Sequence, residues 1–179
     1  MFYSASYCSP LGKITLASQQ NQLVGLWIDG QKYFGAIVTA DIIEKANLPV
    51  FNLTKKWLDN YFAGKNQTIN QLPLAPNGSP FRQKVWDILC NIPYGEVITY
   101  GDIAKQIALQ TNQPNMSSQA VGGAVGHNPI SIIIPCHRVI GANGNLTGYA
   151  GGIDKKIKLL QIEGVDTRNF VLPKKGTAL

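Results

Sequence analysis

A thiol, an imidazole and a guanidinium group follow one another at positions 136–138 of this chain. The residues are Cys136, His137 and Arg138, and they come directly after the apolar run IIIP. Pro135 can neither continue a helix nor donate to a sheet, so a buried segment should stop there and present the thiol. The thiolate is the reactive form of cysteine, and a neighbouring imidazole and positive charge can lower its pKa. An isolated Cys-His pair, however, is also typical of a buried structural cysteine followed by two surface residues.

Metal and cofactor chemistry are not favoured by the other candidate residues. The three cysteines, Cys8, Cys90 and Cys136, are an odd number at wide spacings, which indicates reduced thiols in a cytoplasmic protein. With His127 they could supply four zinc ligands, but no closely spaced cysteine pair supports that site, so we expect no metal. The glycine-rich segment 141–152 lacks the G-x-G-x-x-G spacing of a dinucleotide site, and we expect no cofactor.

The composition is that of a folded protein with one good core or two small ones. Of the 179 residues, 45% are hydrophobic and 15% are charged, and the formal net charge is +6. From residue 80 onward ten Lys and Arg stand against six Asp and Glu, a mild basic bias that is compatible with a polyanionic partner. The start of the chain does not have the pattern of a signal peptide, and no apolar stretch approaches the ~20 residues of a membrane span.

The first part of the chain predicts an α/β domain. Three short β-favouring runs separated by turn-rich SPLG and QQNQ predict an antiparallel meander: Phe2–Cys8, Lys13–Ser18 and Gln22–Ile28. A helix is predicted over Asn52–Phe62, ended by Gly64. The Pro- and Gly-containing stretch 67–79 is typical of a linker, so we predict two domains, 1–78 and 79–179.

The second domain predicts mainly helices. Ser79 and Pro80 suit the start of a helix that stops at Ile92–Pro93. Thr99 and Asp102 resemble a capping box for a helix through about Leu109. After the polar loop 110–116, Ser117 or Ser118 should cap a third helix, SSQAVGGAVG, in a helix-turn-helix arrangement.

The last predicted helix begins near Asp154 and ends at Gly164. Its inward positions are predicted to be Ile157, Leu160 and Gln161. Glu163 falls in the final turn, where a carboxylate opposes the helix dipole, so it is either solvated or placed to meet a cation.

The third predicted helix consists largely of small residues. Its interior glycines each cost roughly 1 kcal/mol of helix stability relative to alanine, which suggests that something approaches its backbone closely. That partner is either another helix or a DNA duplex. The helix carries no Arg or Lys, so binding to DNA would be tolerant of sequence.

Several separated blocks, in order, resemble the O6-alkylguanine-DNA alkyltransferase family. They are AVGGAVGHNP at 120–129, PCHRV at 135–139, TGYAGG at 147–152 and the pair Glu163-Gly164. The match covers residues 79–165, whereas the N-terminal part is similar only in size and layout. The resemblance implies a ribonuclease-H-like α/β domain followed by a winged-helix-like helical domain with a helix-turn-helix.

The resemblance also implies a function and a set of site residues. Members of this family repair O6-methylguanine, and less readily O4-methylthymine, in double-stranded DNA by irreversible transfer of the alkyl group to cysteine after flipping the base out of the helix. No S-adenosylmethionine is needed, because the lesion is the methyl donor, and we expect a monomer that acts once. The residues that the resemblance assigns to transfer are Cys136 as acceptor, His137 as a base acting through a water, Glu163 orienting the imidazole, Asn128 tying the helix-turn-helix to the reactive loop, and Tyr100 hydrogen-bonding the flipped purine. Those expected around the base are Val139, Tyr149 and Ala150, and those expected at the DNA are Gln119, Ala120, Gly122, Gly123 and Arg138.

A departure from the family pattern at position 119 and two alternative functions remain. The family often has an arginine that fills the gap left by the extruded base, and Gln119 occupies that position here. A lesion sensor that binds O6-alkylguanine without repairing it is one alternative, although such proteins typically lack the acceptor cysteine. A Cys-His hydrolase is the other, and because adjacent Cys and His side chains rarely face each other it would need His127 as its base.

Overall fold

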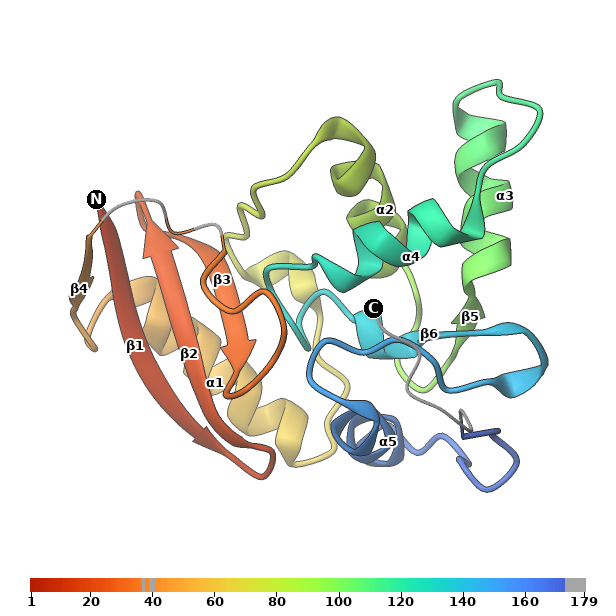
Figure 1. Ribbon diagram of the computed structural model, residues 1–179. Helices are drawn as coiled ribbons and strands as arrows, with labels where there is room; N and C mark the ends of the chain where they lie inside the picture. Colours follow the sequence, from red (N-terminus) through yellow and green to blue (C-terminus); the bar gives the residue numbers. More distant parts are fainter. Residues whose placement is uncertain (37, 39–40, 173–179) are drawn as a thin grey trace. The chain divides into compact units, whose positions relative to one another are not determined.

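The computed structural model of this protein describes residues 1–36, 38 and 41–172. It divides into two compact units (Figure 1). The first comprises Met1–Asn77 together with Pro129–Ile133, and the second comprises Gly78–Asn128 and the chain from Ile134 onward. Five residues that the predicted boundary gave to the second domain therefore belong to the first unit. None of the described helices combines the length and the apolar character that spanning a membrane requires.

In its described residues, the first unit is a four-stranded sheet with one α-helix. The strands are β1 (Phe2–Ser9), β2 (Gly12–Gln19), β3 (Gln22–Ile28) and β4 (Ile42–Glu44), in the spatial order β3-β2-β1-β4. The predicted meander of β1, β2 and β3 is confirmed, and the tight β2–β3 turn places Gln20 and Asn21 at positive φ, as a two-residue hairpin requires. The short strand β4, which pairs parallel to β1, was not predicted.

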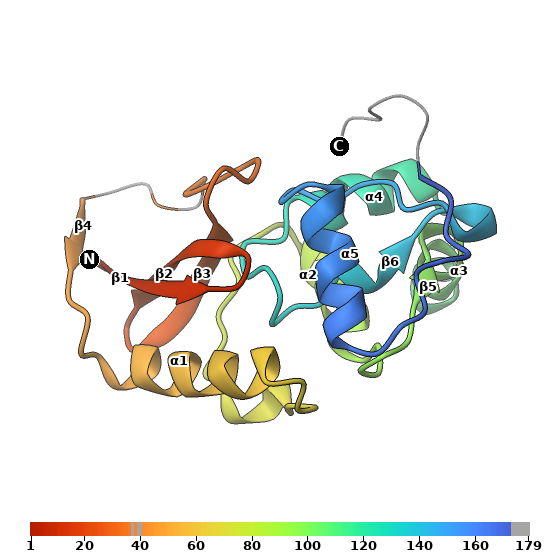
Figure 2. The same ribbon diagram turned by 90° about the horizontal axis from the view of Figure 1, so that it is seen from below.

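Helix α1 (Pro49–Phe62) lies along one face of the sheet (Figure 2). It begins three residues before the predicted start, because Pro49 occupies the first helical turn, where a missing N–H costs nothing. Its buried residues are Val50, Phe51, Thr54, Trp57, Leu58 and Tyr61. A 3-10 helix, η1 (Ile69–Gln71), follows in the predicted linker.

The segment Pro129–Ile133 is bonded to strand β3. The Leu26 amide donates to Pro129 O at 2.9 Å, and the Ser131 amide donates to Leu26 O at 3.0 Å. Ile132 is buried and has a φ of +71°, a conformation that branched side chains rarely adopt. This strain is of order 1–3 kcal/mol and is held in place by the surrounding packing.

The second unit contains the remaining helices. They are α2 (Pro80–Cys90), α3 (Tyr100–Gln110), α4 (Ser118–Gly126) and α5 (Ile153–Ile162). Three predicted caps are confirmed: the Ser79, Thr99 and Ser117 hydroxyls accept from the amides of Arg82, Asp102 and Ala120. The predicted fold class, an α/β part followed by a mainly helical part, is confirmed.

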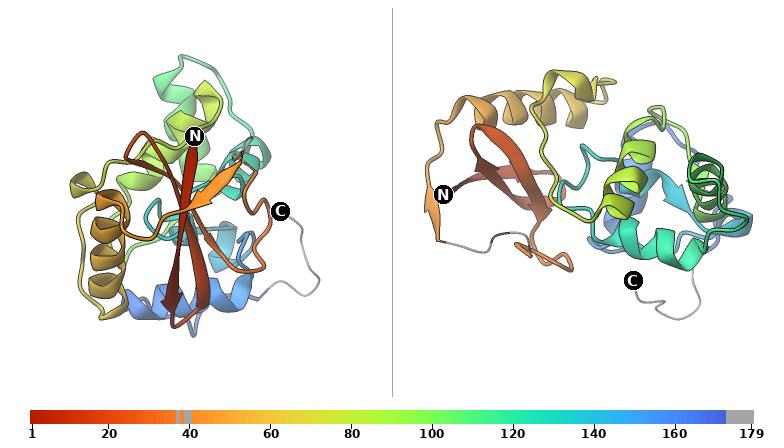
Figure 3. Two further views of the ribbon diagram at one scale, coloured as in Figure 1. Left: turned by 90° about the vertical axis from the view of Figure 1, so that its left-hand side faces the viewer. Right: turned by 90° about the horizontal axis from the view of Figure 1, so that it is seen from above.

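The second unit also contains two very short strands, which lie among its helices. Strand β5 (Ile98–Thr99) pairs parallel to β6 (Val139–Ile140), with Ile98 opposite Val139. Helices α2, α3 and α4 lie on one side of this pair and α5 lies on the other (Figure 3). Since α3 starts directly after β5, the pairing brings Tyr100 close to the residues that follow Cys136. Two 3-10 helices, η2 (Cys136–Arg138) and η3 (Ala142–Gly144), flank β6.

Helix α5 corrects one sequence prediction. Leu160 is buried as predicted, but Gln161 is exposed and Ile157 is only half-buried, and the other buried residues of the helix are Lys156 and Leu159. Positions 156, 160 and 163 are four and three residues apart and therefore share one helical face, whereas position 161 is turned away from it. The inward face of α5 thus carries Lys156 at its start and leads to Glu163, which caps the helix.

Candidate active site

The three consecutive polar residues that follow the apolar run are all buried. Cys136, His137 and Arg138 form the 3-10 helix η2, and their exposed fractions are 4%, 0% and 7%. The alternative of a structural cysteine followed by two surface residues is therefore wrong. A buried imidazole and guanidinium need partners, and both find one in Glu163.

The Cys136 sulfur accepts a hydrogen bond from Asn128. Asn128 Nδ2 donates to Cys136 Sγ at 3.2 Å and to Ile134 O at 2.8 Å, so a single amide bonds both the thiol and the chain before it. Asn128 lies two residues beyond the end of α4. It therefore connects the glycine-rich helix to the cysteine turn.

Burial raises the pKa of the Cys136 thiol, and several groups oppose that effect. The Asn128 hydrogen bond, the charge of Lys156 and the backbone amides of Cys136 and His137 all lower it, but burial dominates. His137 and Arg138 were expected to supply the charge that stabilises the thiolate, whereas the cation that acts on the thiol is Lys156. Cys136 is thus a protonated thiol at neutral pH, and a reaction at its sulfur requires a base.

His137 is hydrogen-bonded to a carboxylate. Its Nε2 lies 2.6 Å from Glu163 Oε1, and both side chains are fully buried. Burial lowers the pKa of His137, so the imidazole is neutral at rest, although the bond to Glu163 works in the opposite direction. Because an ionised carboxylate only accepts, Nε2 carries the proton and Nδ1 carries the lone pair. This is the arrangement of a general base oriented by a carboxylate.

Arg138 holds Glu163 in its ionised form. Arg138 Nε donates to Glu163 Oε2 at 2.8 Å, a second guanidinium nitrogen donates to Oε1 at 3.1 Å, and the Gly95 amide adds a bond to Oε2 at 3.2 Å. Burial alone would raise the pKa of Glu163, but the bonds and charges of His137 and Arg138 outweigh it and lower the pKa to about 2. Of the two alternatives for Glu163, solvation or a contact with a cation, the second is therefore correct, and the cation is Arg138.

This ion pair corrects the expectation that Arg138 contacts DNA. Its guanidinium is buried against Glu163 and also donates to Ile92 O at 2.5 Å. A side chain that is committed inside the unit in this way is not available to a phosphate. We reassign Arg138 to the network that supports His137.

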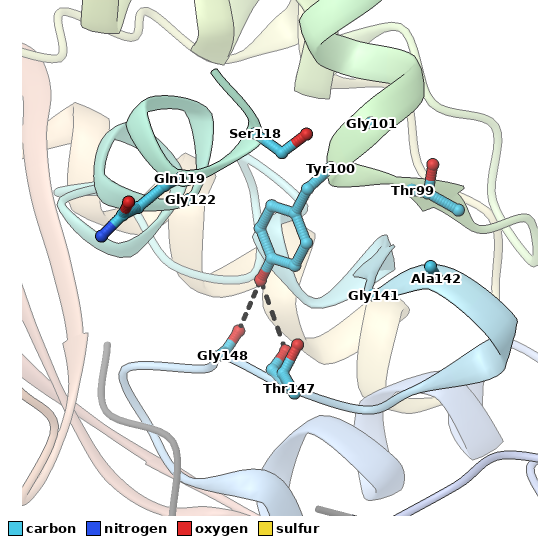
Figure 4. A pocket seen from close by; sticks show the side chains of 10 residues that line it. All are labelled: Thr99, Tyr100, Gly101, Ser118, Gln119, Gly122, Gly141, Ala142, Thr147 and Gly148. Atoms are coloured by element: carbon cyan, nitrogen blue, oxygen red, sulfur yellow. Dashed lines mark hydrogen bonds between the residues drawn. The ribbon is translucent and has the colours of Figure 1, made fainter.

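Tyr100 occupies the first position of α3 and reaches the loop after β6. Its hydroxyl donates to Gly148 O at 3.1 Å and lies 3.3 Å from Thr147 O (Figure 4). Burial and the nearby Cys136 raise its pKa, so the hydroxyl keeps its proton and remains a donor. Tyr100 is thus a hydrogen-bond donor close to the thiol.

A pocket of about 450 Å³ opens beside Tyr100, within the ~300–1,000 Å³ typical of small-molecule sites. Helices α3 and α4 and the loops after β6 enclose it (Figure 4). Gln119 and Gly122 line it, whereas Ala120 and Gly123 do not. Gln119 and Ala120 are exposed, and Gly123 has open space where a side chain would project. The outward surface of α4 therefore carries small or uncharged side chains.

The residues expected around the base lie in and next to the same loop. Tyr149 is buried, and its hydroxyl has no hydrogen-bond partner in the described part of the chain. Burial, Cys136 and Glu163 raise its pKa. Val139 is also buried, and its carbonyl accepts from Lys156, while Ala150 is half-buried. Cys136 does not line the pocket.

Lys156 is a residue of this site that was not predicted from the sequence. This residue is fully buried in α5, yet its ammonium bonds to loop carbonyls on the side of the unit that holds Cys136. The signal was present in the sequence, since Lys156 shares a helical face with Leu160 and Glu163. A lysine is unusual on the apolar face of a short helix, and this position could have identified Lys156 as a functional residue.

His127, the base that a Cys-His hydrolase would require, bonds a main-chain carbonyl of helix α4. His127 Nδ1 lies 2.7 Å from Gly123 O in its own helix, whereas the carboxylate-bound imidazole is that of His137. In the described residues no group of three or more His, Cys, Asp or Glu could hold a metal ion.

Two family models match the chain and together span most of it. One, described as "6-O-methylguanine DNA methyltransferase, DNA binding domain", matches residues 80–165. The other, described as "6-O-methylguanine DNA methyltransferase, ribonuclease-like domain", matches residues 2–76.

Individual relatives and solved structures agree with these matches. The chain is 44% identical over 167 residues to a methylated-DNA–protein-cysteine methyltransferase of Methanosarcina acetivorans, covering 90% of this chain and 98% of that protein. It is 38% identical over 163 residues to the Haemophilus influenzae protein of that name, covering 91% and 87%. The crystal structure of Mycobacterium tuberculosis O6-methylguanine methyltransferase superposes with a TM-score of 0.77 at 39% identity, covering 98% of this chain and 97% of that one. The complex of the Mycobacterium tuberculosis protein OGT with DNA gives 0.75 at 40% identity, covering 90% and 91%. The chain therefore belongs to the 6-O-methylguanine DNA methyltransferase family.

Proposed function

We propose that this protein repairs O6-alkylguanine in double-stranded DNA by transferring the alkyl group irreversibly to Cys136 Sγ. The observation that carries the proposal is the buried His137–Glu163 contact of 2.6 Å directly after a buried, protonated cysteine. That combination supplies a nucleophile and a means of removing its proton. The family membership of the chain supplies the substrate class.

The transfer is a single in-line displacement at the alkyl carbon. The thiol proton passes through a water molecule to Nδ1 of His137, and the resulting imidazolium is stabilised by the ionised Glu163. A sulfur–carbon bond then forms as the bond between carbon and O6 breaks. The electron pair of the broken bond stays on the guanine, which leaves as an anion. It regains its ordinary keto form by taking up one proton at N1, which balances the proton that the thiol gave up.

Tyr100 is the donor that assists the departing guanine. Its raised pKa keeps the hydroxyl protonated, so it can donate a hydrogen bond to the purine as negative charge develops there. The hydroxyl is bonded to Thr147 O and Gly148 O, so the incoming base has to replace these contacts. The O6 atom lies inside the duplex, and the base must therefore be flipped out at a cost of a few kcal/mol.

The pocket beside α4 supports this route for the base. It has room for a purine. Tyr149, the residue after the pocket-lining Gly148, is buried and lies near enough to Cys136 for that group to raise its pKa. The exposed Gln119 and Ala120 and the open surface at Gly123 allow α4 to approach a duplex closely. Gln119 can hydrogen-bond the orphaned cytosine but brings no charge to it.

The protein acts once per molecule, as a monomer in the cytoplasm. A thioether does not hydrolyse, and the proposed chemistry provides no second nucleophile to release the alkyl group. The methyl donor is the lesion itself, so the reaction uses no cofactor. A reducing compartment suits the three cysteines, all of which are free thiols in the structure.

The direct test is incubation with duplex DNA that carries radiolabelled O6-methylguanine. Stoichiometric movement of the label onto the protein, with the mass of one methyl group on the peptide containing Cys136, is the expected result. Tight binding to the lesion without transfer would instead identify a sensor. No binding and no transfer would contradict the proposal altogether.

Replacing Gln119 by arginine tests the α4 surface. Gln119→Arg is expected to bind duplex more tightly and to steepen the dependence of log K on log salt by about 0.9, the increment for one more phosphate contact. Gln71→Arg adds the same charge at an exposed position of the first unit and serves as the matched control. Equal salt slopes for the two variants would mean that position 119 does not reach the DNA.

A further inference from the structure

Lys156 is a buried charged residue to which the proposed chemistry gives no role. It projects from α5 and is fully buried. Its ammonium donates to three main-chain carbonyls: Val139 O at 2.5 Å, Thr147 O at 2.8 Å and Gly148 O at 3.4 Å. In the described part of the chain no carboxylate lies within ion-pair distance of it. Three N–H donors thus meet three backbone acceptors.

These carbonyls belong to two separate segments of the site. Val139 directly follows η2, the turn that contains Cys136 and His137. Thr147 and Gly148 lie on the loop that lines the pocket. A single ammonium group therefore ties the nucleophile's turn to the pocket wall.

Tyr100 bonds the same two loop carbonyls from helix α3. Its hydroxyl and the Lys156 ammonium share Thr147 O and Gly148 O, and a carbonyl oxygen can accept two hydrogen bonds. When Tyr100 turns to the flipped purine, its bonds to the loop are lost. The bonds from Lys156 are then the ones that keep the loop in place beside the sulfur.

We propose that Lys156 is a positioning residue for alkyl transfer: it clamps the Val139, Thr147 and Gly148 carbonyls and so fixes the pocket loop relative to Cys136. The kinetic part of this inference rests on the proposed function, whereas the clamp itself does not. Misplacement of reacting groups by about 1 Å costs roughly a hundredfold in rate, which is the scale on which such a residue acts.

The charge of Lys156 adds to the same effect. Burial lowers its pKa to about 8, while the nearby Cys136 acts in the opposite direction, so the amine is mainly charged at pH 7. The groups that face it are the Cys136 thiol, the His137 imidazole and, through the shared carbonyls, the Tyr100 hydroxyl. Of these, the thiol is the group that gains from a positive neighbour when it ionises.

The decisive variants are Lys156→Met, which has neither donors nor charge, and Lys156→Gln, which keeps two N–H donors without charge. Lys158→Met on the exposed face of α5 is the matched control. Thermal unfolding of each variant separates a local change from a loss of global stability. If Lys156→Met does not fold, Lys156→Gln carries the comparison.

The first measurement, hydrogen–deuterium exchange, needs no substrate. Faster exchange in segment 139–152 of Lys156→Met, with exchange in α2 and in the Lys158→Met protein unchanged, is the expected result. Unchanged exchange in that segment would overturn the clamp. This result stands whether or not the protein repairs DNA.

The second measurement is single-turnover methyl transfer at varied concentrations of DNA. For Lys156→Met the rate constant at saturating DNA is expected to fall about 10- to 100-fold, with the half-saturating DNA concentration unchanged. Lys156→Gln should fall between Lys156→Met and the wild type. A loss confined to DNA binding, or one equally present in Lys158→Met, would overturn the positioning role. Absence of transfer by the wild-type protein would instead contradict the proposed function.

Discussion

Cys136→Ala is expected to abolish methyl transfer completely while leaving binding to lesion-containing duplex intact. The substitution removes the only atom that forms a bond to the alkyl group in the proposed reaction, and the exposed surface of α4 is unaffected because the Cys136 side chain is buried. The fold should survive, since a single buried substitution of this size costs about 1 kcal/mol. Transfer of radiolabel and a gel-shift titration with the same duplex measure the two properties separately.

The other two cysteines provide matched controls. Cys8 is exposed and Cys90 is half-buried, and the pKa of the Cys90 thiol is raised to about 11 by burial and by Asp87 despite the opposing charge of Arg138. Cys8→Ala and Cys90→Ala should each still accept one methyl group per molecule. Any label on the Cys136→Ala protein would show that the acceptor is a different residue.

Glu163→Gln is expected to slow transfer by about a hundredfold or more, the usual contribution of a general base. The amide cannot stabilise the imidazolium that forms when His137 takes the thiol proton. It also leaves the buried Arg138 without its anionic partner, and breaking a buried pair in this way costs about 3–5 kcal/mol. Single-turnover rates and urea unfolding of the same preparations give the two effects. An unchanged rate would remove Glu163 from the mechanism.

The double variant Arg138→Met/Glu163→Gln separates catalysis from stability. Removing both charges relieves the unpaired guanidinium, so the free energy of unfolding should recover part of what Glu163→Gln loses. The transfer rate should stay low, because the carboxylate is still missing. Recovery of both quantities together would mean that Glu163 acts through the fold alone.

The lowered pKa of Glu163 also predicts the acid stability of the protein. Its pKa is about 2 in the folded chain, against an ordinary value of ~4.3. A carboxyl whose pKa falls on folding contributes its full stabilisation above the ordinary value and loses it as the pH approaches the folded value. The free energy of unfolding should therefore decrease from about pH 5 down to pH 2. Glu163→Gln should show a shallower decrease over this range in urea titrations.

The sequence determined the local structure and the identity of the chemistry. The capping residues Ser79, Thr99 and Ser117 and the meander of the first three strands were predictable because caps and turns act over a few residues. The side chains in PCHRV indicated a nucleophile and a base, and Glu163 at the end of a helix indicated a carboxylate that could pair with a cation. Each of these inferences needed only neighbours along the chain or a resemblance in spacing.

The tertiary structure decided which partners the charged residues take. Arg138 was expected at the DNA surface but bonds Glu163, 25 residues away. Lys156 was not predicted as a site residue, although it bonds carbonyls on two segments. Gln161 was predicted to be buried but is exposed. The strand pair β5–β6, only two residues long on each side, could not be recognised from periodicity. A buried charge is stabilised by whichever groups the packing brings within hydrogen-bond distance, and that distance is set by the fold rather than by spacing along the chain.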